Sequence, residues 1–189
     1  MLNQRIKGLY GITQNKNLDM KLIECVFNKH KINILQYRHK IKNDKLKLKE
    51  AKQLLELCQQ HNTLFIINDD INLCKKIGAD GVHLGQNDID INSARKQLGK
   101  NFIIGVTCHN NLKLALDSQK NYADYIALGA VFKSTTKLNT TNCSLSKIQN
   151  IRKNIHIPIV GIGGITFENQ KQVYDAGCDS VAMVEGLFG

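Results

Sequence analysis

The chain has 189 residues, 42% hydrophobic and 22% charged, and no apolar run reaches the roughly 18 residues that a membrane span needs. This composition is typical of an ordinary globular protein, and we predict one domain over residues 1–189. The net charge is +10, but the basic residues are not gathered beside aromatic residues and no nucleic-acid motif is present. We therefore expect small phosphorylated partners and no nucleic acid.

The six cysteines are scattered along the chain without a Cys-x-x-Cys pair. This spacing indicates reduced, mostly buried thiols rather than disulfides or a zinc site. The first residues, MLNQRIKGLYGIT, lack the apolar stretch and cleavage site of a signal peptide. We therefore expect a cytoplasmic protein without a membrane partner.

Short apolar segments alternate with amphipathic segments from one end of the chain to the other. The apolar segments are 8–13, 32–38, 63–69, 81–85, 102–107, 124–131, 158–163 and 180–185. They are rich in β-branched and aromatic residues, as expected of strands covered on both faces. Among the intervening segments, 44–61 has its apolar residues on one stripe of a helix, namely Leu48, Ala51, Leu54, Leu55 and Cys58.

Eight such pairs in fewer than 200 residues predict an α/β fold, a single (β/α)8 TIM barrel. The alternative is an open doubly wound sheet, although no G-x-G-x-x-G follows the first strand. An internal repeat supports the reuse of one unit, because "KIGADGVHLG" (76–85), "KNYADYIALG" (120–129) and "DAGCDSVAMV" (175–184) share a helix end, an Asp and an apolar strand.

Polar side chains follow nearly every predicted strand. They are Thr13, Gln36, Arg38, Lys40, Asn68, Asp69, Gln86, Asp88, Thr107, His109, Ser134, Thr135, Thr136, Lys137, Gly163, Gly164 and Glu185, the two glycines being included for their backbone groups. Because a barrel builds its active site where its strands end, we expect these residues to form one polar mouth.

Two of these residues are candidate metal ligands. Asp69 and Asp88 follow the adjacent third and fourth strands and would repel each other without a cation between them. Mg²⁺ takes few protein carboxylates and completes its shell with water and substrate phosphate. The alternatives are a loop or helix cap for the Asn-Asp-Asp cluster, and a cap of the helix beginning "INSARKQL" for Asp88.

Several residues suit phosphate. Arg38, Lys40 and Lys137 are cations at strand ends, and "KSTTK" (133–137) adds three hydroxyl groups. "GIGGIT" (161–166) is a candidate phosphate cradle, because glycine lets backbone N–H groups approach an anion. The alternatives are solvated surface charges, a polar loop and a simple turn. His83 is expected to be a hydrogen-bonded core residue.

The motifs "LQYRHK" (35–40), "IIND" (66–69), "GADGVHLGQND" (78–88), "IIGVTCH" (103–109), "STTK" (134–137) and "VGIGGIT" (160–166) occur in one order. With them the chain resembles the thiamine phosphate synthase family along nearly its whole length. The resemblance implies a (β/α)8 barrel and a transferase of thiamine biosynthesis. Such an enzyme joins a hydroxymethylpyrimidine pyrophosphate to a carboxylated thiazole phosphate, giving thiamine phosphate, pyrophosphate and carbon dioxide, by a dissociative route that needs no base.

The resemblance also assigns roles to residues. It implies a pyrimidine pyrophosphate site of Gln36, Tyr37, Arg38, His39, Lys40, Asn68, Thr107 and Lys137, with Lys137, Arg38 and Thr107 catalytic. It implies a thiazole phosphate site of Ser134, Thr135, Thr136, Gly164, Val184 and Glu185, and one Mg²⁺ per subunit on Asp69 and Asp88.

The chain departs from the family pattern at a few positions. Thr107 stands where the family usually has Ser, and Glu185 stands where a Ser helps to bind the thiazole phosphate, so that a carboxylate would face a phosphate. Only four residues follow the eighth predicted strand, whereas the family usually continues into a last helix. Without that helix one flank of the barrel would be bare, and a homodimer would cover it. The alternatives are a thiazole tautomerase, against which Asp69 and Asp88 argue, and an altered binding protein of the same fold.

Overall fold

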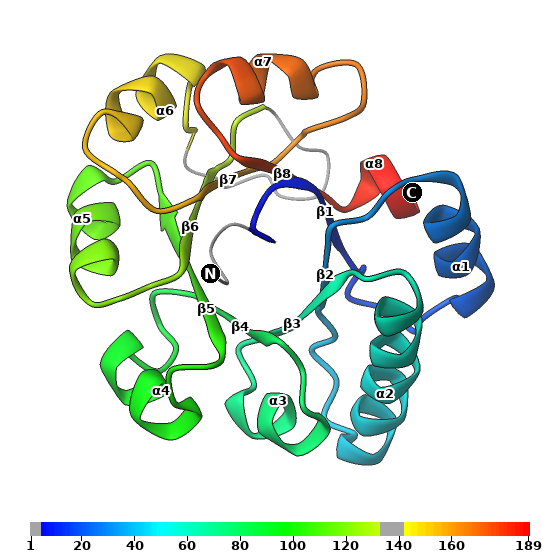
Figure 1. Cartoon of the computed structure of the whole chain (residues 1–189). Coiled ribbons are helices and arrows are strands. Elements are labelled where there is room, and N and C mark those ends of the chain that lie inside the picture. The colour runs from blue at the N-terminus through cyan, green and yellow to red at the C-terminus, as the bar shows by residue number, and fades with distance from the viewer. Residues whose placement is uncertain (1–4, 133–141) are drawn as a thin grey trace.

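The computed structural model describes residues 5–132 and 142–189, in which eight parallel strands alternate with eight helices and close into a barrel (Figure 1). The strands are β1 (Gly8–Ile12), β2 (Ile34–Tyr37), β3 (Leu64–Asn68), β4 (Gly81–Leu84), β5 (Ile103–His109), β6 (Tyr125–Gly129), β7 (Ile159–Ile162) and β8 (Ser180–Met183). Each predicted strand agrees with an observed one to within two residues at either end. The predicted (β/α)8 barrel is confirmed, and the open sheet is excluded because β1 pairs with both β2 and β8.

The helices form a ring around the strands (Figure 1). They are α1 (Met20–Lys29), α2 (Asp44–Gln60), α3 (Ile71–Ile77), α4 (Ile91–Leu98), α5 (Leu112–Lys120), α6 (Leu145–Arg152), α7 (Gln170–Asp175) and α8 (Glu185–Phe188). The apolar stripe predicted for α2 faces inward, since Ala51, Leu54 and Cys58 are fully buried. None of the helices in the described ranges is long and apolar enough to cross a membrane.

Successive strand residues point alternately into the barrel and toward the helices, which gives two hydrophobic layers. The inner layer consists of Ile6, Tyr10, Ile12, Ile34, Leu64, Ile66, Ile103, Tyr125, Ala127, Val160 and Ala182. The outer layer packs residues such as Leu35, Phe65 and Val82 against the helices. Five of the six cysteines are buried, Cys25 is exposed, and all six are free thiols, as predicted.

The three aspartates of the internal repeat tie neighbouring strands together where the strands begin. The Oδ2 atoms of Asp80, Asp124 and Asp179 accept hydrogen bonds of 2.7, 2.8 and 2.8 Å from the N–H groups of Phe65, Ile104 and Ile159. Each aspartate N–H donates in return to the carbonyl oxygen of that same residue. The repeat therefore encodes a two-bond clasp, which satisfies backbone groups near the start of the earlier strand.

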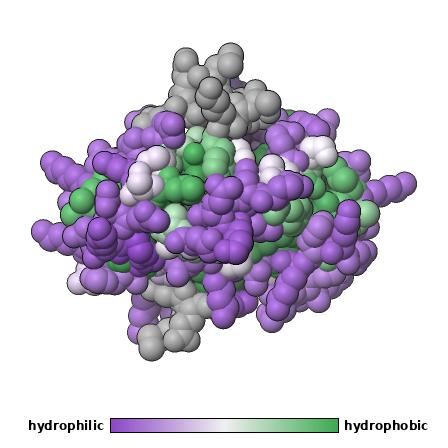
Figure 2. All heavy atoms as spheres, turned by 90° about the horizontal axis from the view of Figure 1, so that it is seen from above, coloured by the Kyte–Doolittle hydropathy of each residue, from purple (hydrophilic) through white to green (hydrophobic). Residues whose placement is uncertain are grey.

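The last strand is followed by a single helical turn. Leu187 and Phe188 of α8 are buried, and this short element lies between β8 and α1 (Figure 1). The barrel thus has a helix after its last strand, four residues long. The face shown in Figure 2 is largely hydrophilic, with hydrophobic side chains visible between the polar ones.

The clasps predict a stability defect without a functional one. Asp124 also lies 2.6 Å from Arg95 Nη2, so Asp124→Ala removes an acceptor shared by Ile104 N–H and a guanidinium. We expect the free energy of unfolding to fall by about 2–3 kcal/mol, measured by urea denaturation. Asp124→Asn keeps one acceptor oxygen, so its free energy of unfolding should fall by less. Equal stability of Asp124→Ala and the wild type would contradict the role of the clasp.

Candidate active site

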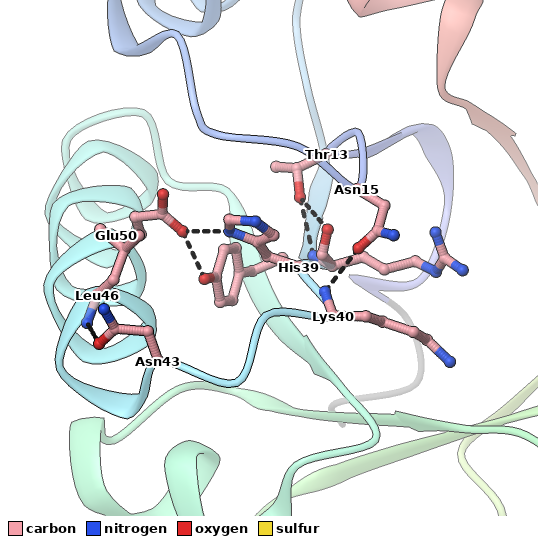
Figure 3. A network of polar contacts seen from close by, with 9 residues as sticks. Thr13, Asn15, His39, Lys40, Asn43, Leu46 and Glu50 are labelled. Atoms are coloured by element: carbon pink, nitrogen blue, oxygen red, sulfur yellow. Dashed lines mark hydrogen bonds and ion pairs between the residues drawn. The ribbon is translucent and has the colours of Figure 1, made fainter.

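The segment after β2 carries two cations on a backbone that is held from both sides. Arg38 N–H donates to Thr13 Oγ1 at 2.8 Å, and the Thr13 hydroxyl donates to the Arg38 carbonyl oxygen at 3.3 Å. Lys40 N–H donates to Asn15 Oδ1 at 2.6 Å. The residues after β1 thus fix the backbone of this segment, and the Lys40 side chain extends away from α2 (Figure 3).

The side chains of Tyr37 and His39 face α2 instead of the mouth. Tyr37 Oη donates to Glu50 Oε2 at 2.7 Å, and His39 Nδ1 donates to the same oxygen at 2.8 Å (Figure 3). Burial, followed by the Glu50 carboxylate, raises the pKa of Tyr37 well above its usual value, so the phenol remains a donor. The predicted contact of these two residues with a pyrophosphate stays a prediction, while the structure shows both side chains bonded to Glu50.

The polar cluster after β3 divides its tasks. Asp70 caps α3, since its Oδ1 accepts from Leu73 N–H at 2.9 Å, so the cap reading is correct for this residue. Asp69 has a left-handed backbone with φ of 61°, which Asp tolerates better than most residues. Its N–H donates to the His83 carbonyl oxygen at 2.9 Å, continuing the pairing of β3 with β4. Asn68, the last residue of β3, is half-buried at the same rim.

Asp69 and Asp88 come together beside a lysine. Burial raises the pKa of Asp69, and the neighbouring Asp88 carboxyl raises it further, whereas Lys40 lowers it. Lys40 Nζ lies 3.6 Å from Asp69 Oδ2. Two carboxyl groups from adjacent strand ends thus compete for the same space, as predicted from their positions.

The alternative role of Asp88 as a helix cap is wrong. The N-cap of α4 is Asp90, whose Oδ1 accepts from Ser93 N–H at 3.0 Å. Asp88 instead accepts from Gly85 N–H through Oδ2 at 2.7 Å, which folds the loop after β4 back on itself. Its carboxyl group also faces Asp69.

The donor set fits a hard divalent cation. Two carboxylates with no nitrogen or sulfur ligand are the partial shell that Mg²⁺ uses when water and phosphate supply the rest. Within residues 5–132 and 142–189, no three His, Cys, Asp or Glu side chains converge as a complete metal cage.

Polar residues of the barrel interior lie below the mouth. Gln36 is buried and donates from Nε2 to Tyr10 Oη at 2.8 Å. His83 is buried and hydrogen-bonded through both ring nitrogens, to Tyr125 Oη at 3.0 Å and to Thr107 Oγ1 at 2.8 Å. The prediction of a satisfied core histidine is confirmed. Tyr10 and Tyr125 were missed because both lie in apolar runs, although strand alternation would place them inside.

The glycine-rich loop after β7 is braced by Asn169. Its Oδ1 accepts from Thr166 N–H and its Nδ2 donates to the Gly164 carbonyl oxygen, both at 2.9 Å. Gly163 and Gly164 have φ of 102° and 63°, and a Cβ on Gly163 would come within 2.5 Å of Ala130. Glycine is therefore required here for the tight backbone path.

Glu185 and Val184 follow β8. The Glu185 carboxylate is exposed, and its Oε1 accepts from Gln14 Nε2 at 3.2 Å. The residues predicted for the loop after β6, namely Ser134, Thr135, Thr136 and Lys137, lie outside the described residues.

The fold and this site define a class of protein, a (β/α)8 barrel enzyme whose strand ends present carboxylates, cations and a glycine-rich loop at one mouth. The sequence model described as "Thiamine monophosphate synthase" matches residues 9–187. The chain therefore belongs to the thiamine monophosphate synthase family.

Individual relatives agree with this assignment. The chain is 42% identical to the "Thiamine-phosphate synthase" of Nitrosococcus oceani, over 99% of this chain and 88% of that protein. It is 41% identical to the protein of the same name from Thioalkalivibrio sulfidiphilus, over 98% of this chain and 89% of that protein. The solved "Thiamine phosphate pyrophosphorylase from Pyrococcus furiosus" superposes with a TM-score of 0.89 at 28% identity, covering 100% of this chain and 90% of that one.

The contacts of Glu50 predict that it supports the segment after β2, which carries Arg38 and Lys40. Glu50→Ala should lower the free energy of unfolding by about 2–3 kcal/mol, because two buried donors lose their acceptor. If Arg38 and Lys40 bind the pyrophosphate as the sequence predicts, Glu50→Ala should also raise the Michaelis constant for that substrate. Thermal melting and steady-state kinetics measure the two effects. Glu56→Ala, an exposed position on the same helix, is the matched control and should change neither.

Proposed function

We propose that the chain condenses a hydroxymethylpyrimidine pyrophosphate with a thiazole phosphate to give thiamine phosphate and pyrophosphate. The carboxylated thiazole phosphate would also release carbon dioxide. Membership of the thiamine monophosphate synthase family supports the reaction. The structural observation that carries it is the pairing of Asp69 with Asp88 beside Lys40 at the mouth of the barrel.

The pyrophosphate would lie on the cations of the mouth. Arg38 and Lys40 project from a segment whose backbone is already held by Thr13 and Asn15, so binding costs little conformational freedom beyond that of the two side chains. Lys137 is assigned to the same group by the family motif alone. These cations stabilise the charge that develops as the C–O bond to the pyrimidine methylene breaks and pyrophosphate leaves with the electron pair.

The thiazole nitrogen then donates its lone pair to the pyrimidine methylene cation, forming the C–N bond. With the carboxylated substrate, the bond to the carboxylate breaks next, carbon dioxide leaves, and the electron pair that stays on the ring carbon takes up a proton from water. No protein base is required, which agrees with His83 being occupied on both ring nitrogens.

Asp69 and Asp88 are the residues that would hold Mg²⁺. When bound, this ion supplies further charge stabilisation to the leaving pyrophosphate. The carboxylates lie beside Lys40, so that a phosphate and its metal would meet adjacent groups of opposite charge.

The thiazole phosphate would take the loop after β7 together with Ser134, Thr135 and Thr136. The bracing of Gly164 by Asn169 supports a preformed backbone at this loop. The bond from Gln14 to Glu185 supports a carboxylate that is engaged by the loop after β1 instead of a phosphate. The proposed cytoplasmic location and the homodimer stay predictions.

The reaction is tested with the purified protein, both substrates and Mg²⁺. We expect thiamine phosphate and stoichiometric pyrophosphate, detected by chromatography and a coupled phosphate assay. Chelation should stop turnover, and Mg²⁺ should restore it. A protein that makes no thiamine phosphate under these conditions, while melting cooperatively, would contradict the proposal.

The metal assignment predicts the behaviour of Asp69→Asn and Asp88→Asn. Each should raise the Mg²⁺ concentration for half-maximal activity by about tenfold or more, because one anionic ligand is lost. A second readout needs no turnover: Asp88→Asn should raise the melting temperature of the metal-free protein, because it relieves the repulsion on Asp69. Asp44→Asn, an exposed residue of α2, is the matched control. Wild-type Mg²⁺ dependence in both variants would contradict the assignment.

A further inference from the structure

A continuous chain of hydrogen bonds crosses the inside of the barrel. It runs from Gln36 Nε2 to Tyr10 Oη at 2.8 Å, to Tyr125 Oη at 2.8 Å, to His83 Nδ1 at 3.0 Å, and from His83 Nε2 to Thr107 Oγ1 at 2.8 Å. Four strands contribute to it besides β2, namely β1, β4, β5 and β6. Its two ends are residues already assigned to the pyrimidine pyrophosphate site.

This hydrogen-bond chain is enclosed in apolar surroundings. Tyr10 and Tyr125 are 1% and 0% exposed, in the layer formed by residues such as Ile34 and Ile66. Burial raises the pKa of Tyr10 to about 12 and that of Tyr125 well above its usual value, so both phenols keep their protons. His83 is buried as well and is hydrogen-bonded through both ring nitrogens.

Counting protons gives the chain a direction. Because Gln36 donates to Tyr10, the Tyr10 hydroxyl must donate onward to Tyr125, and Tyr125 must donate to His83 Nδ1. The neutral ring then carries its single proton on Nε2 and donates it to Thr107 Oγ1. The opposite direction would leave the Tyr10 proton with no acceptor, because the Gln36 amide nitrogen only donates.

The direction decides what Thr107 offers to the mouth. Since Thr107 Oγ1 accepts from His83, its own hydroxyl proton is not used inside the barrel. The Thr107 backbone is held as well, because Gln86 Nε2 donates to its carbonyl oxygen. The half-buried hydroxyl is thereby prepared to donate to an acceptor atom of a substrate above it.

We infer that Tyr10, Tyr125 and His83 are positioning residues that hold the Thr107 hydroxyl as a hydrogen-bond donor to the pyrimidine pyrophosphate. The inference rests on the proposed function and deepens it. The hydrogen-bond chain also orients the Gln36 amide, whose nitrogen donates to Tyr10. The amide oxygen is then left as an acceptor for the same substrate. The site would therefore select a pyrimidine ligand that presents an acceptor to Thr107 and a donor to Gln36.

A double-mutant cycle tests whether Tyr125 acts through Thr107. Tyr125→Phe removes only the central hydroxyl and frees His83 to accept a proton from Thr107. We expect kcat/KM for the pyrimidine pyrophosphate to fall about tenfold, with the Michaelis constant for the thiazole phosphate unchanged. Thr107→Val should lower kcat/KM for the pyrimidine pyrophosphate about a hundredfold. Adding Tyr125→Phe to Thr107→Val should have no further effect.

Controls separate positioning from stability and from the proposed function. Thr63→Val removes a buried 2.7 Å bond to the Ile32 carbonyl oxygen at the start of β3, away from the mouth, and should lower the melting temperature without changing kcat/KM. Multiplicative losses in the double mutant, or wild-type kinetics of Tyr125→Phe, would overturn the inference. Absence of thiamine phosphate with the wild type would instead overturn the proposed function.

A measurement on the unmutated protein keeps the inference testable if a variant fails to fold. Nitrogen-15 NMR of the histidine rings reports which nitrogen of His83 is protonated. We expect the proton on Nε2 at pH 7. A proton on Nδ1 would reverse the chain, direct the Thr107 hydroxyl at His83, and overturn the inference.

Discussion

The closure of eight parallel strands into one ring is the constraint on which the rest of this molecule depends. Because all strands run in the same direction, every strand ends at one rim and begins at the other. Lys40, Asp69 and Asp88, from three different strand ends, meet there without any long loop to carry them. The interior must be filled by side chains, so polar groups are tolerated inside only where they satisfy one another.

Much of this architecture could be predicted from the sequence, because strand length, apolar content and helix periodicity are local properties. The residue that follows each strand is local as well, which explains why Asp69 and Asp88 were expected as a pair. Side-chain direction beyond a strand end is not local. Tyr37 and His39 lie in the binding motif yet face Glu50 of α2, and alternation from the inward Gln36 would have predicted this for Tyr37 only.

The sequence could not reveal contacts that depend on strand register. The repeated Asp80, Asp124 and Asp179 were recognised as a pattern, but their bonds to the preceding strand follow from pairing that no single unit encodes. Tyr10 and Tyr125 are 115 positions apart in two apolar runs, and only barrel closure brings their hydroxyl groups to 2.8 Å. A buried tyrosine carries no sequence signal for its partner.

The same residue type plays opposite roles at the two rims of the barrel. Where strands begin, an aspartate such as Asp179 is surrounded by donors, with Ile159 N–H at 2.8 Å and Arg152 Nη1 at 2.9 Å. Such carboxylates stabilise the fold, because their bonds join a strand backbone to its neighbour and, in Asp179, also to a guanidinium. Where strands end, Asp69 faces the carboxyl group of Asp88, and burial disfavours its charge. A fold that gives its carboxylates donors at one rim but sets two carboxylates against each other at the other rim carries a cost in stability there, and a bound cation, as proposed above, would relieve it.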